Sequence, residues 1–393
     1  MIMNILLVTE TYLPWITGVS ISTFNIAKYM ASRGHKITIA CPTPIVKGKI
    51  PKIPNCKVVF VPAYPFTFYN LRATAILPLA IVKIDKLVRM EKYDLIHIQE
   101  PAETGVAALI AAKKYKIPVT GYLHFIPEQI DRVLWGSAER ILTPIINVYV
   151  RFIYDKYNIA MTPSHFFKNY LKFLGVKTPI EVVSNGVEID KFKPRPKNLN
   201  FRKKYNIPEN KVLFMYLGRL DGDKNVTTLV KATEHVDKNA HMLIIGKGKI
   251  KNYLHDLAKN LKSDSKITWI DYVTDEEMIE AYNASDVFTI MSPYEGQSIV
   301  TLQAAASGLP IIAANAGALP EICRDNENGY LCHSLDDQTL AKKMNILTKN
   351  TKLRYKMGKE SRKISLMHNR STVLKKLEDL FLTVRTNVGS TST

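Results

Sequence analysis

The sequence predicts an α/β fold of two doubly wound, Rossmann-like domains that face a shared cleft. Short β-branched runs alternate with longer helical patterns, which is typical of parallel sheets covered by helices. The chain has 393 residues, enough for two domains that each bury a core of their own. Apolar residues make up 46% of it, a share that indicates a globular protein.

The expected strands recur at short intervals along both halves of the chain. Those of the first half lie at 5–8, 37–40, 58–61, 95–98, 119–122, 159–162 and 180–183. Those of the second half lie at 213–217, 242–245, 267–270, 287–290 and 311–313. A helix is expected after the first strand, and it ends at Gly34. Its apolar side is formed by Ile21, Phe24, Ala27 and Met30.

A polar segment at 190–211 separates the two halves. It is rich in Pro, Lys and Asn and poorly periodic, so we expect it to be the interdomain linker. The predicted domains are therefore residues 1–190 and 191–365. Residues 366–393 are expected to form a helix that returns to the first domain, with a frayed tail over 386–393.

The formal net charge of +19 narrows the choice of partners. Residues 1–190 carry 22 Lys and Arg against 13 Asp and Glu, and the remainder carries 32 against 22, so the charge is +9 and +10 in the two parts. An anionic membrane surface, an anionic small substrate and nucleic acid are all compatible with such a charge. No recognition motif accompanies it, which disfavours a basic nucleic-acid-binding protein without enzymatic activity.

The sequence favours a cytoplasmic location. No apolar stretch approaches the roughly 20 residues that span a bilayer, and the longest, at 73–82, contains Pro78. The start of the chain lacks a basic region and a small-residue cleavage site, so we expect a first strand there and not a signal peptide. The four cysteines show no CxxC spacing, which is typical of reduced thiols.

The segment 292–310, SPYEGQSIVTLQAAASGLP, is the most informative in the chain. Glu295 lies beside Gly296, and Ser298 is suited to cap a helix over 299–306 that a glycine and a proline would end. The first turn of such a helix presents unpaired backbone N–H groups that bind phosphate. A carboxylate next to such a phosphate-binding site suits a phosphorylated, hydroxyl-rich ligand such as a nucleotide sugar.

The loop YLGRLDGDK at 216–224 follows a predicted buried strand. Arg219 and Lys224 could both reach one diphosphate from this loop, Arg as a fork and Lys as a point charge. The alternative is two solvated surface cations. The loop also holds Asp221 and Asp223 in the order of a metal-binding DxD. We expect no metal there, because two cations are close by and because turns commonly use Asp and Gly.

Glycine patterns in two other loops bear on a nicotinamide cofactor. In the loop 9–22, Gly18 would let the backbone approach a ligand closely, and Ser20 or Ser22 could cap the following helix. This loop is not GxGxxG, and LIIGKGK at 243–249 lacks the third glycine. A dehydrogenase is therefore disfavoured.

Two histidines lie near predicted strand ends. His124 follows an apolar strand and precedes Pro127 and Glu128, so we expect it to point into the cleft. His97 is expected to be structural. The sequence has no GxSxG elbow, HExxH or P-loop, which removes the common hydrolase and NTPase mechanisms.

Taken together, these segments resemble the family-four retaining glycosyltransferases of the GT-B fold, including lipid glycosyltransferases such as monoglucosyldiacylglycerol synthases. The resemblance covers nearly the whole chain, in the TGVS turn with the following Gly34-His35, DLIHIQEP, the His124 segment, VVSNGVEIDKFKP, GRLDGDK and EGQSIVTLQ. It implies that residues 1–190 bind the acceptor and that residues 191–365 bind the nucleotide sugar.

The resemblance also implies residue roles. Arg219 and Lys224 would bind the donor diphosphate, and Gly18 would close over the phosphates. His124 would approach the donor sugar, and Glu295 would contact that sugar as the first glutamate of an E-x7-E motif. The other implied donor-binding residues are Gly296, Gln297, Ser298, Ile299 and Gln303.

Two positions depart from the family pattern. Thr17 replaces the first of two glycines after the first strand, which leaves that loop's backbone less free. Gln303 replaces the second glutamate of E-x7-E, which normally binds the ribose hydroxyls. An amide still offers an acceptor and two donors, but it forfeits charge-assisted bonds of roughly twice the strength. We expect weaker or altered binding of the nucleoside by an active enzyme.

The implied reaction moves a hexose from a nucleotide-diphosphate sugar, expected to be a UDP-sugar, to a hydroxyl group with retention at the anomeric carbon. Fixed cations and a helix N-terminus would stabilise the leaving diphosphate, so no metal or other cofactor is required. The segments 63–90 and 135–151 mix aromatic, apolar and basic residues that suit a bilayer interface. We expect a membrane-lipid acceptor and a peripheral place on the inner face of the cell membrane, with a soluble sugar or polysaccharide acceptor as the alternative.

Overall fold

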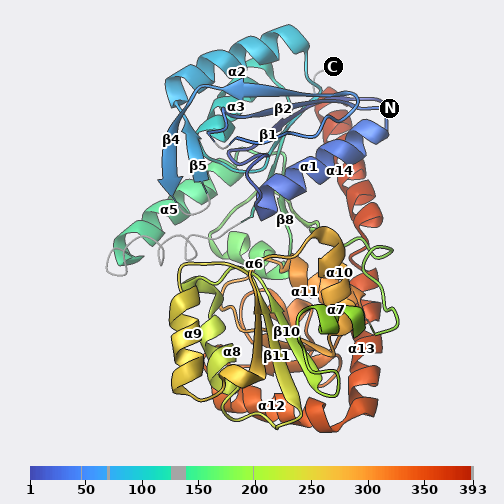
Figure 1. The fold of residues 1–393 in the computed structure, drawn as a ribbon. Helices are drawn as coiled ribbons and strands as arrows, with labels where there is room; N and C mark the ends of the chain where they lie inside the picture. Colours follow the sequence, from blue (N-terminus) through green and yellow to red (C-terminus); the bar gives the residue numbers. More distant parts are fainter. Residues whose placement is uncertain (46, 69–70, 125–138, 198, 391–393) are drawn as a thin grey trace. The chain divides into compact units, whose positions relative to one another are not determined.

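A computed structural model describes residues 1–393 except 46, 69–70, 125–138, 198 and 391–393 (Figure 1). The chain divides into two compact units. Unit 1 comprises Met1–Ser184 and Val373–Thr393, and unit 2 comprises Asn185–Thr372. Each unit is a parallel sheet covered by helices, which is the predicted α/β class.

Unit 1 is built on a seven-stranded parallel sheet. Its strands, in spatial order, are β3 (Cys56–Val61), β2 (Lys36–Pro42), β1 (Asn4–Val8), β6 (Leu95–Ile98), β7 (Val119–Tyr122), β8 (Ile159–Thr162) and β9 (Ile180–Val182). Every strand predicted in the first half of the chain is present. β1 pairs with both β2 and β6, so the strand order reverses there and the loops after β1 and β6 leave the sheet side by side.

Helices cover both faces of this sheet. One face packs against α2 (Leu77–Glu91), α3 (Glu103–Tyr115), α5 (Glu139–Tyr154) and α6 (His165–Phe173), and the other packs against α1 (Gly18–Ser32) and α14 (Arg370–Ser390). Successive side chains of β1 point to opposite faces of the sheet. Leu6 and Val8 pack in the core on one face, and Ile5 and Leu7 pack in the core on the other.

The N-cap of α1 is Thr17, so the predicted cap at Ser20 or Ser22 is wrong. Thr17 Oγ1 accepts a hydrogen bond from the Ser20 N–H at 3.1 Å, and Ser20 Oγ accepts one from the Thr17 N–H at 2.8 Å. This reciprocal capping box satisfies two backbone donors at once. The threonine that replaces a family glycine therefore begins the helix, and Met30 on the predicted apolar side is fully buried.

An antiparallel hairpin of β4 (Ala63–Phe68) and β5 (Leu71–Ala75) precedes α2, and the sequence does not predict it. Pro65 lacks a donor for the ladder, and the register shifts between Pro65 and Phe68. Both features hide the alternation that normally marks a strand.

Unit 2 is built on a six-stranded parallel sheet. Its strands, in spatial order, are β12 (Ile267–Ile270), β11 (Ala240–Ile245), β10 (Val212–Leu217), β13 (Val287–Ile290), β14 (Ile311–Ala314) and β15 (Gly329–Cys332). Its helices are α7 (Leu199–Lys204), α8 (Val226–Ala232), α9 (Lys251–Asn260), α10 (Asp275–Ala284), α11 (Ile299–Ala306), α12 (Asp337–Lys349) and α13 (Thr351–Leu366), with 3-10 turns at Gly222–Lys224, Asp264–Lys266 and Leu319–Glu321. All strands predicted in the second half are present, and β15 is an additional one.

The predicted linker at 190–211 is wrong, because this segment is part of the core of unit 2. Phe192 and Phe201 are 1% exposed and belong to its hydrophobic cluster. Arg202 is fully buried, and its guanidinium donates to the Ala284 carbonyl and pairs with Asp286 at 2.9 Å. The polar composition thus conceals two anchoring aromatics and a cation whose donors are satisfied inside the fold.

The tail is also more regular than predicted. α14 continues to Ser390, so residues 386–390 are helical, while 391–393 lie outside the described residues. Within the described parts of the chain, no helix is long and apolar enough to cross a bilayer.

Candidate functional site

Two loops of unit 2 leave the same edge of its sheet. β10 and β13 are parallel neighbours, so the loops after Leu217 and Ile290 both start from carboxyl ends of strands. This is the edge at which doubly wound sheets bind ligands. The first loop carries Arg219 and Lys224, and the second carries Glu295.

The structure brings Lys224 and Glu295 together. Lys224 Nζ lies 2.8 Å from Glu295 Oε1, and the two side chains are only 21% and 13% exposed. The Glu295 backbone is also fixed, because its carbonyl accepts a hydrogen bond from the Ala318 N–H at 2.8 Å. Gly317, at φ +57°, leaves room for this carbonyl, since a Cβ there would come within 2.6 Å of it. A carboxylate and a cation are therefore held side by side at the strand ends.

Arg219 pairs with two carboxylates of its own loop, Asp221 and Asp223. Its backbone is fixed by the buried Tyr216, whose hydroxyl donates to the Arg219 carbonyl at 2.8 Å. The Asp-Gly-Asp sequence that resembles a metal-binding motif is thus the partner of a guanidinium. In the part of the chain that the structure describes, no group of three or more His, Cys, Asp or Glu side chains could hold a metal ion.

The two glycines of LIIGKGK pack against the loop that carries the arginine. A Cβ on Gly246 would lie 1.8 Å from the Gly218 carbonyl oxygen, and one on Gly248 would lie 2.1 Å from that of Leu220. Real Cβ atoms never come so close, so both positions require glycine. Their GxG pattern is explained by the approach of two backbones, without a dinucleotide.

Ser298 caps α11 as predicted. Its hydroxyl oxygen accepts a hydrogen bond from the Thr301 N–H at 3.3 Å, and Gly308 follows the helix at φ +78°. Because Glu295 lies three residues before the cap, the carboxylate and the helix N-terminus belong to one short segment. The partial positive charge of that terminus adds to the two cations of the neighbouring loop.

The remaining donor-binding candidates of unit 2 are Gly296, Gln297, Ile299 and Gln303, all on or just before α11. The Gln297 amide oxygen accepts a hydrogen bond from the Asn185 N–H at 2.7 Å. Gln303 is 9% exposed, and its amide oxygen accepts one from the Tyr282 hydroxyl at 3.1 Å. Both glutamine side chains are thus engaged within unit 2.

His124 belongs to unit 1 and is part of a chain of hydrogen-bonded side chains. His124 Nε2 lies 2.6 Å from Gln99 Oε1, and Gln99 Nε2 lies 2.7 Å from His97 Nε2. His97 Nδ1 in turn lies 2.8 Å from Thr120 Oγ1. Burial lowers the pKa of both histidines to about 3, so both rings are neutral near pH 7. The sequence singles out His124 but not its partner Gln99, whose only signal is its place directly after β6.

Gly18, the other predicted site residue of unit 1, is the first residue of α1. A Cβ placed there would meet no atom within 4 Å, so the space in front of this glycine is open. Pro127 and Glu128, which follow His124 in the sequence, lie outside the described residues.

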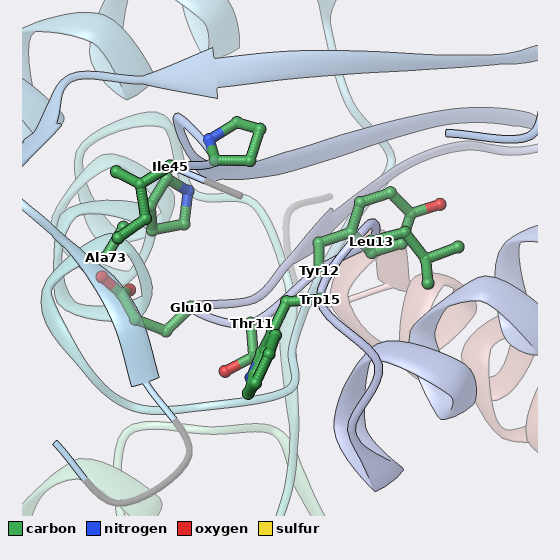
Figure 2. Close-up of a pocket in the computed structure, with 9 residues that line it drawn as sticks. Glu10, Thr11, Tyr12, Leu13, Trp15, Ile45 and Ala73 are labelled. Atoms are coloured by element: carbon green, nitrogen blue, oxygen red, sulfur yellow. The ribbon is translucent and has the colours of Figure 1, made fainter. Parts of the chain in front are cut away.

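Two buried carboxyl groups of unit 1 are absent from the sequence predictions. Glu10 and Glu100 are 4% and 5% exposed and follow β1 and β6, the two central strands. An acidic residue two positions after the end of a predicted buried strand is the signal that could have found them. Figure 2 shows Glu10 in a pocket with Thr11 and Trp15.

Two family models match the chain. The model described as Glycosyltransferase Family 4 matches residues 16–191, and the model described as Glycosyl transferases group 1 matches residues 197–364. The two sheets and the matches together define a nucleotide-sugar-dependent glycosyltransferase with the GT-B fold. Together the two models match most of the chain, which therefore belongs to the family-four glycosyltransferases.

Relatives and solved structures agree with this assignment. The alpha-monoglucosyldiacylglycerol synthase of Acholeplasma laidlawii is 24% identical over 397 residues, covering 97% of this chain and 97% of that protein. The synthase of the same name from Streptococcus pneumoniae is 26% identical over 343 residues, covering 85% of this chain and 76% of that protein. The crystal structure of the Anabaena protein Alr3699/HepE with UDP has a TM-score of 0.79 at 18% identity, covering 97% of this chain and 100% of that one. The predicted GT-B fold is confirmed.

Proposed function

We propose that this glycosyltransferase moves a hexose from a UDP-sugar to a hydroxyl group of a membrane lipid, with retention at the anomeric carbon. The observation that carries the donor half of this proposal is the pairing of Lys224 with Glu295 beside Arg219 and the N-terminus of α11. One small region offers cations and helix amides for a diphosphate and a carboxylate for sugar hydroxyls. The UDP bound to the related Anabaena fold supports uridine as the nucleoside.

The chemistry follows from where charge develops. As the glycosidic bond breaks, the leaving diphosphate gains negative charge, and preorganised cations stabilise that charge without reorganising. Arg219 and Lys224 would take this role, and Glu295 would orient the sugar. Front-face attack by the acceptor hydroxyl would then retain the anomeric configuration.

Other residues enter this proposal through the family resemblance. His124 would contact the donor sugar, and Gly18 would lie against the phosphates. Gly296, Gln297, Ser298 and Ile299 would contribute the helix start, and Gln303 would bind the ribose. No metal is required in this scheme, so we expect transfer to continue in a buffer that contains EDTA.

The acceptor half of the proposal is supported by α5, which carries an exposed apolar face in unit 1. Ile145, Val148 and Phe152 are 61%, 70% and 59% exposed, and their spacing places them on one side of the helix. Lys156 Nζ lies 4.8 Å from the centre of the Phe152 ring, and Arg151 is on the same helix. Apolar groups mixed with cations suit the interface of an anionic bilayer.

Residues 135–138 of the predicted interfacial segment lie outside the described residues. In the other segment, at 63–90, Leu79, Val82 and Met90 of α2 are 47%, 67% and 67% exposed. The two relatives above are, by name, synthases of a glucosylated diacylglycerol, which also favours a lipid acceptor.

The test combines a donor screen with an acceptor screen. Thermal unfolding with UDP-, GDP- and ADP-sugars should show the largest rise in melting temperature for one UDP-sugar. That donor should then give a glycolipid with vesicles that contain diacylglycerol, and NMR of its anomeric proton should show the configuration of the donor. Transfer to a soluble sugar and not to vesicles would favour the alternative acceptor. Failure to release nucleotide from any nucleotide sugar would contradict the proposal itself.

A further inference from the structure

Asn225 is a half-buried residue of unit 2 that follows Lys224 directly. It stands between the 3-10 turn Gly222–Lys224 and the first residue of α8. Its φ of +49° lies in the left-handed region, which asparagine adopts more readily than most residues. An asparagine before a helix commonly caps it, but this side chain makes no capping bond to the backbone of α8. Its amide contacts other loops instead.

The side-chain amide of Asn225 ties three loops together, each of which follows a strand of unit 2. Its Nδ2 donates to the Met291 carbonyl at 3.2 Å and to the Ser334 carbonyl. Met291 directly follows β13, and Ser334 is the second residue after β15. Its Oδ1 accepts from the Thr228 hydroxyl at 3.0 Å. Because carbonyl oxygens only accept hydrogen bonds, the opposite orientation of the amide would leave both loops without a donor.

A second tie lies on the other side of Lys224. The hydroxyl of Ser292, which is fully buried, donates to the Asp223 carbonyl at 3.4 Å. The residues before and after Lys224 are thus each joined to the pair 291–292, and this segment reaches Glu295 three residues later. The two backbones that carry the cation and the carboxylate are therefore held together by contacts other than the ion pair itself.

We propose that Asn225 is a positioning residue of the donor site, which holds the backbone of Lys224 against the loop of Glu295 while the diphosphate binds. The ion pair cannot serve this purpose, because a diphosphate that contacts Lys224 competes with Glu295 for the same cation. The amide of Asn225 keeps its partners, since these are backbone carbonyls outside the ion pair. This inference rests on the proposed function and adds to it a residue that acts through Lys224.

The test uses two variants and a matched control of the full-length enzyme. Asn225→Gly removes the amide but leaves the backbone unstrained, because glycine adopts a positive φ freely. Ser292→Ala removes the second tie with little change in volume. Asn206→Gly is the control, since Asn206 also has a positive φ, +53°, and is exposed.

Isothermal titration calorimetry measures the Kd of UDP and of uridine for each protein. Uridine lacks the diphosphate that Lys224 would bind, so it separates an effect on the cation from an effect on the whole site. An unchanged Kd for uridine also shows that the variant is folded.

We expect Asn225→Gly to raise the Kd of UDP by on the order of 10-fold, as the loss of one or two hydrogen bonds does. Ser292→Ala should raise it less, because its hydrogen bond is longer. The Kd of uridine should stay within about twofold in both variants. Asn206→Gly should match wild type with both ligands.

An unchanged Kd of UDP in Asn225→Gly would overturn the positioning role and leave the proposed function standing. Equal losses of affinity for UDP and uridine would overturn it too, because Asn225 would then support the fold of unit 2 and not the cation. A wild type that binds neither UDP nor any UDP-sugar would instead contradict the proposed function, so the two failures are distinguishable.

Discussion

In the proposed site, Lys224 and Glu295 hold each other in place before any ligand binds. Lys224 Nζ lies 2.8 Å from Glu295, and both side chains are mostly buried, so neither is free to search other conformations. A diphosphate that contacts Lys224 would draw the cation away from the carboxylate. Glu295 could then accept hydrogen bonds from a sugar hydroxyl, so that each group exchanges one partner for another. Binding would in this way cost little desolvation, because the two charges are already paired.

Arg219 is the residue whose loss should most directly affect turnover. We expect Arg219→Ala to lower kcat by on the order of 10²-fold, because one preorganised donor to the leaving group is removed. Arg324→Ala is a matched control, since that arginine pairs with Glu327 at the surface, 3.2 Å away. Release of UDP at saturating donor measures the effect. An Arg219→Ala enzyme with wild-type turnover would contradict the proposed site.

Gln99 connects two neutral imidazoles and should control their protonation. Gln99→Glu would place a carboxylate within hydrogen-bond distance of His97 and His124, and an adjacent negative charge favours the imidazolium form. We expect the pKa of these histidines to rise from about 3 towards or above the ordinary value of 6.5.

NMR titration of the ring protons of the histidines measures this shift. Gln99→Leu is the comparison, because it removes the hydrogen bonds without adding charge and should leave both rings neutral. If the two variants titrate alike, the hydrogen-bonded chain does not set the state of His124.

Glu10 should make stability depend on pH. The pKa of this carboxyl is about 7 in the folded protein against an ordinary value of 4.5, so the folded state holds the proton more tightly than the unfolded state. The free energy of unfolding is therefore highest below pH 4.5 as far as this group is concerned, and falls as the pH rises towards 7. Glu10→Gln removes this dependence.

Urea unfolding at pH 5 and pH 8 tests the point. The free energy of unfolding of Glu10→Gln, measured relative to that of wild type, should be higher at pH 8 than at pH 5. The expected difference is up to a few kcal/mol, at about 1.4 kcal/mol per pKa unit. Comparing the two pH values cancels any constant effect of the amide on the hydrogen bonds. A difference between variant and wild type that is the same at both pH values would show that Glu10 does not titrate in this range.

Among elements, those with local signals are the ones that the sequence predicts. Most strands of the two sheets are short runs of mainly apolar residues. The start of α11 follows from Ser298, whose side chain caps the N–H of Thr301 three residues later. Elements held by distant partners are missed. The segment 190–211 contains Arg202, whose contacts at Ala284 and Asp286 are more than 80 residues away.

The site follows the same rule. The sequence indicates Arg219, Lys224 and Glu295 because they follow predicted strands. The structure brings two of them together in the Lys224–Glu295 ion pair. Gln99 and Glu10 also follow predicted strands, but their roles depend on contacts with His124 and with residues as distant as Ala75, which the sequence alone does not predict.

The helix α5 should decide whether unit 1 binds a bilayer. Val148→Glu places a carboxylate in the middle of its exposed apolar face, so it should lower pelleting with vesicles of anionic phospholipid severalfold at low salt. Ile346→Glu on α12 makes the same change in charge at a site 42% exposed and should have little effect. Binding should also weaken with added salt, because the Debye length falls to about 3 Å at 1 M. Wild-type protein that does not pellet at low salt would exclude α5 as a membrane helix.

At the scale of the whole molecule, the chain leaves unit 1 at Ser184 and re-enters it at Val373. Unit 2 is therefore one continuous segment, whereas unit 1 depends on the C-terminal helix. Leu377, Phe381 and Val384 of α14 are 1%, 0% and 3% exposed and pack in the same core as β1 and α1. The carboxylate of Glu378 lies 3.0 Å from Nε2 of His35, the residue directly before β2.

Removing the last 21 residues, Val373–Thr393, should consequently unfold unit 1 and spare unit 2. Burial of each large apolar side chain contributes roughly 1.5–3 kcal/mol, so losing three approaches the 5–15 kcal/mol that stabilises a typical domain. A chain that ends at Arg385 keeps all three and is the matched control.

Hydrogen exchange read by mass spectrometry should show loss of protection in peptides of β1 and α1 for the chain that ends at Thr372, while β10 and β13 stay protected. UDP should still raise the melting temperature of the shortened chain, since Arg219, Lys224 and Glu295 all lie in unit 2. The chain that ends at Arg385 should match wild type in both measurements. If the shorter chain instead unfolds in one transition at the wild-type temperature, α14 contributes nothing to unit 1, because its apolar contacts would then be dispensable.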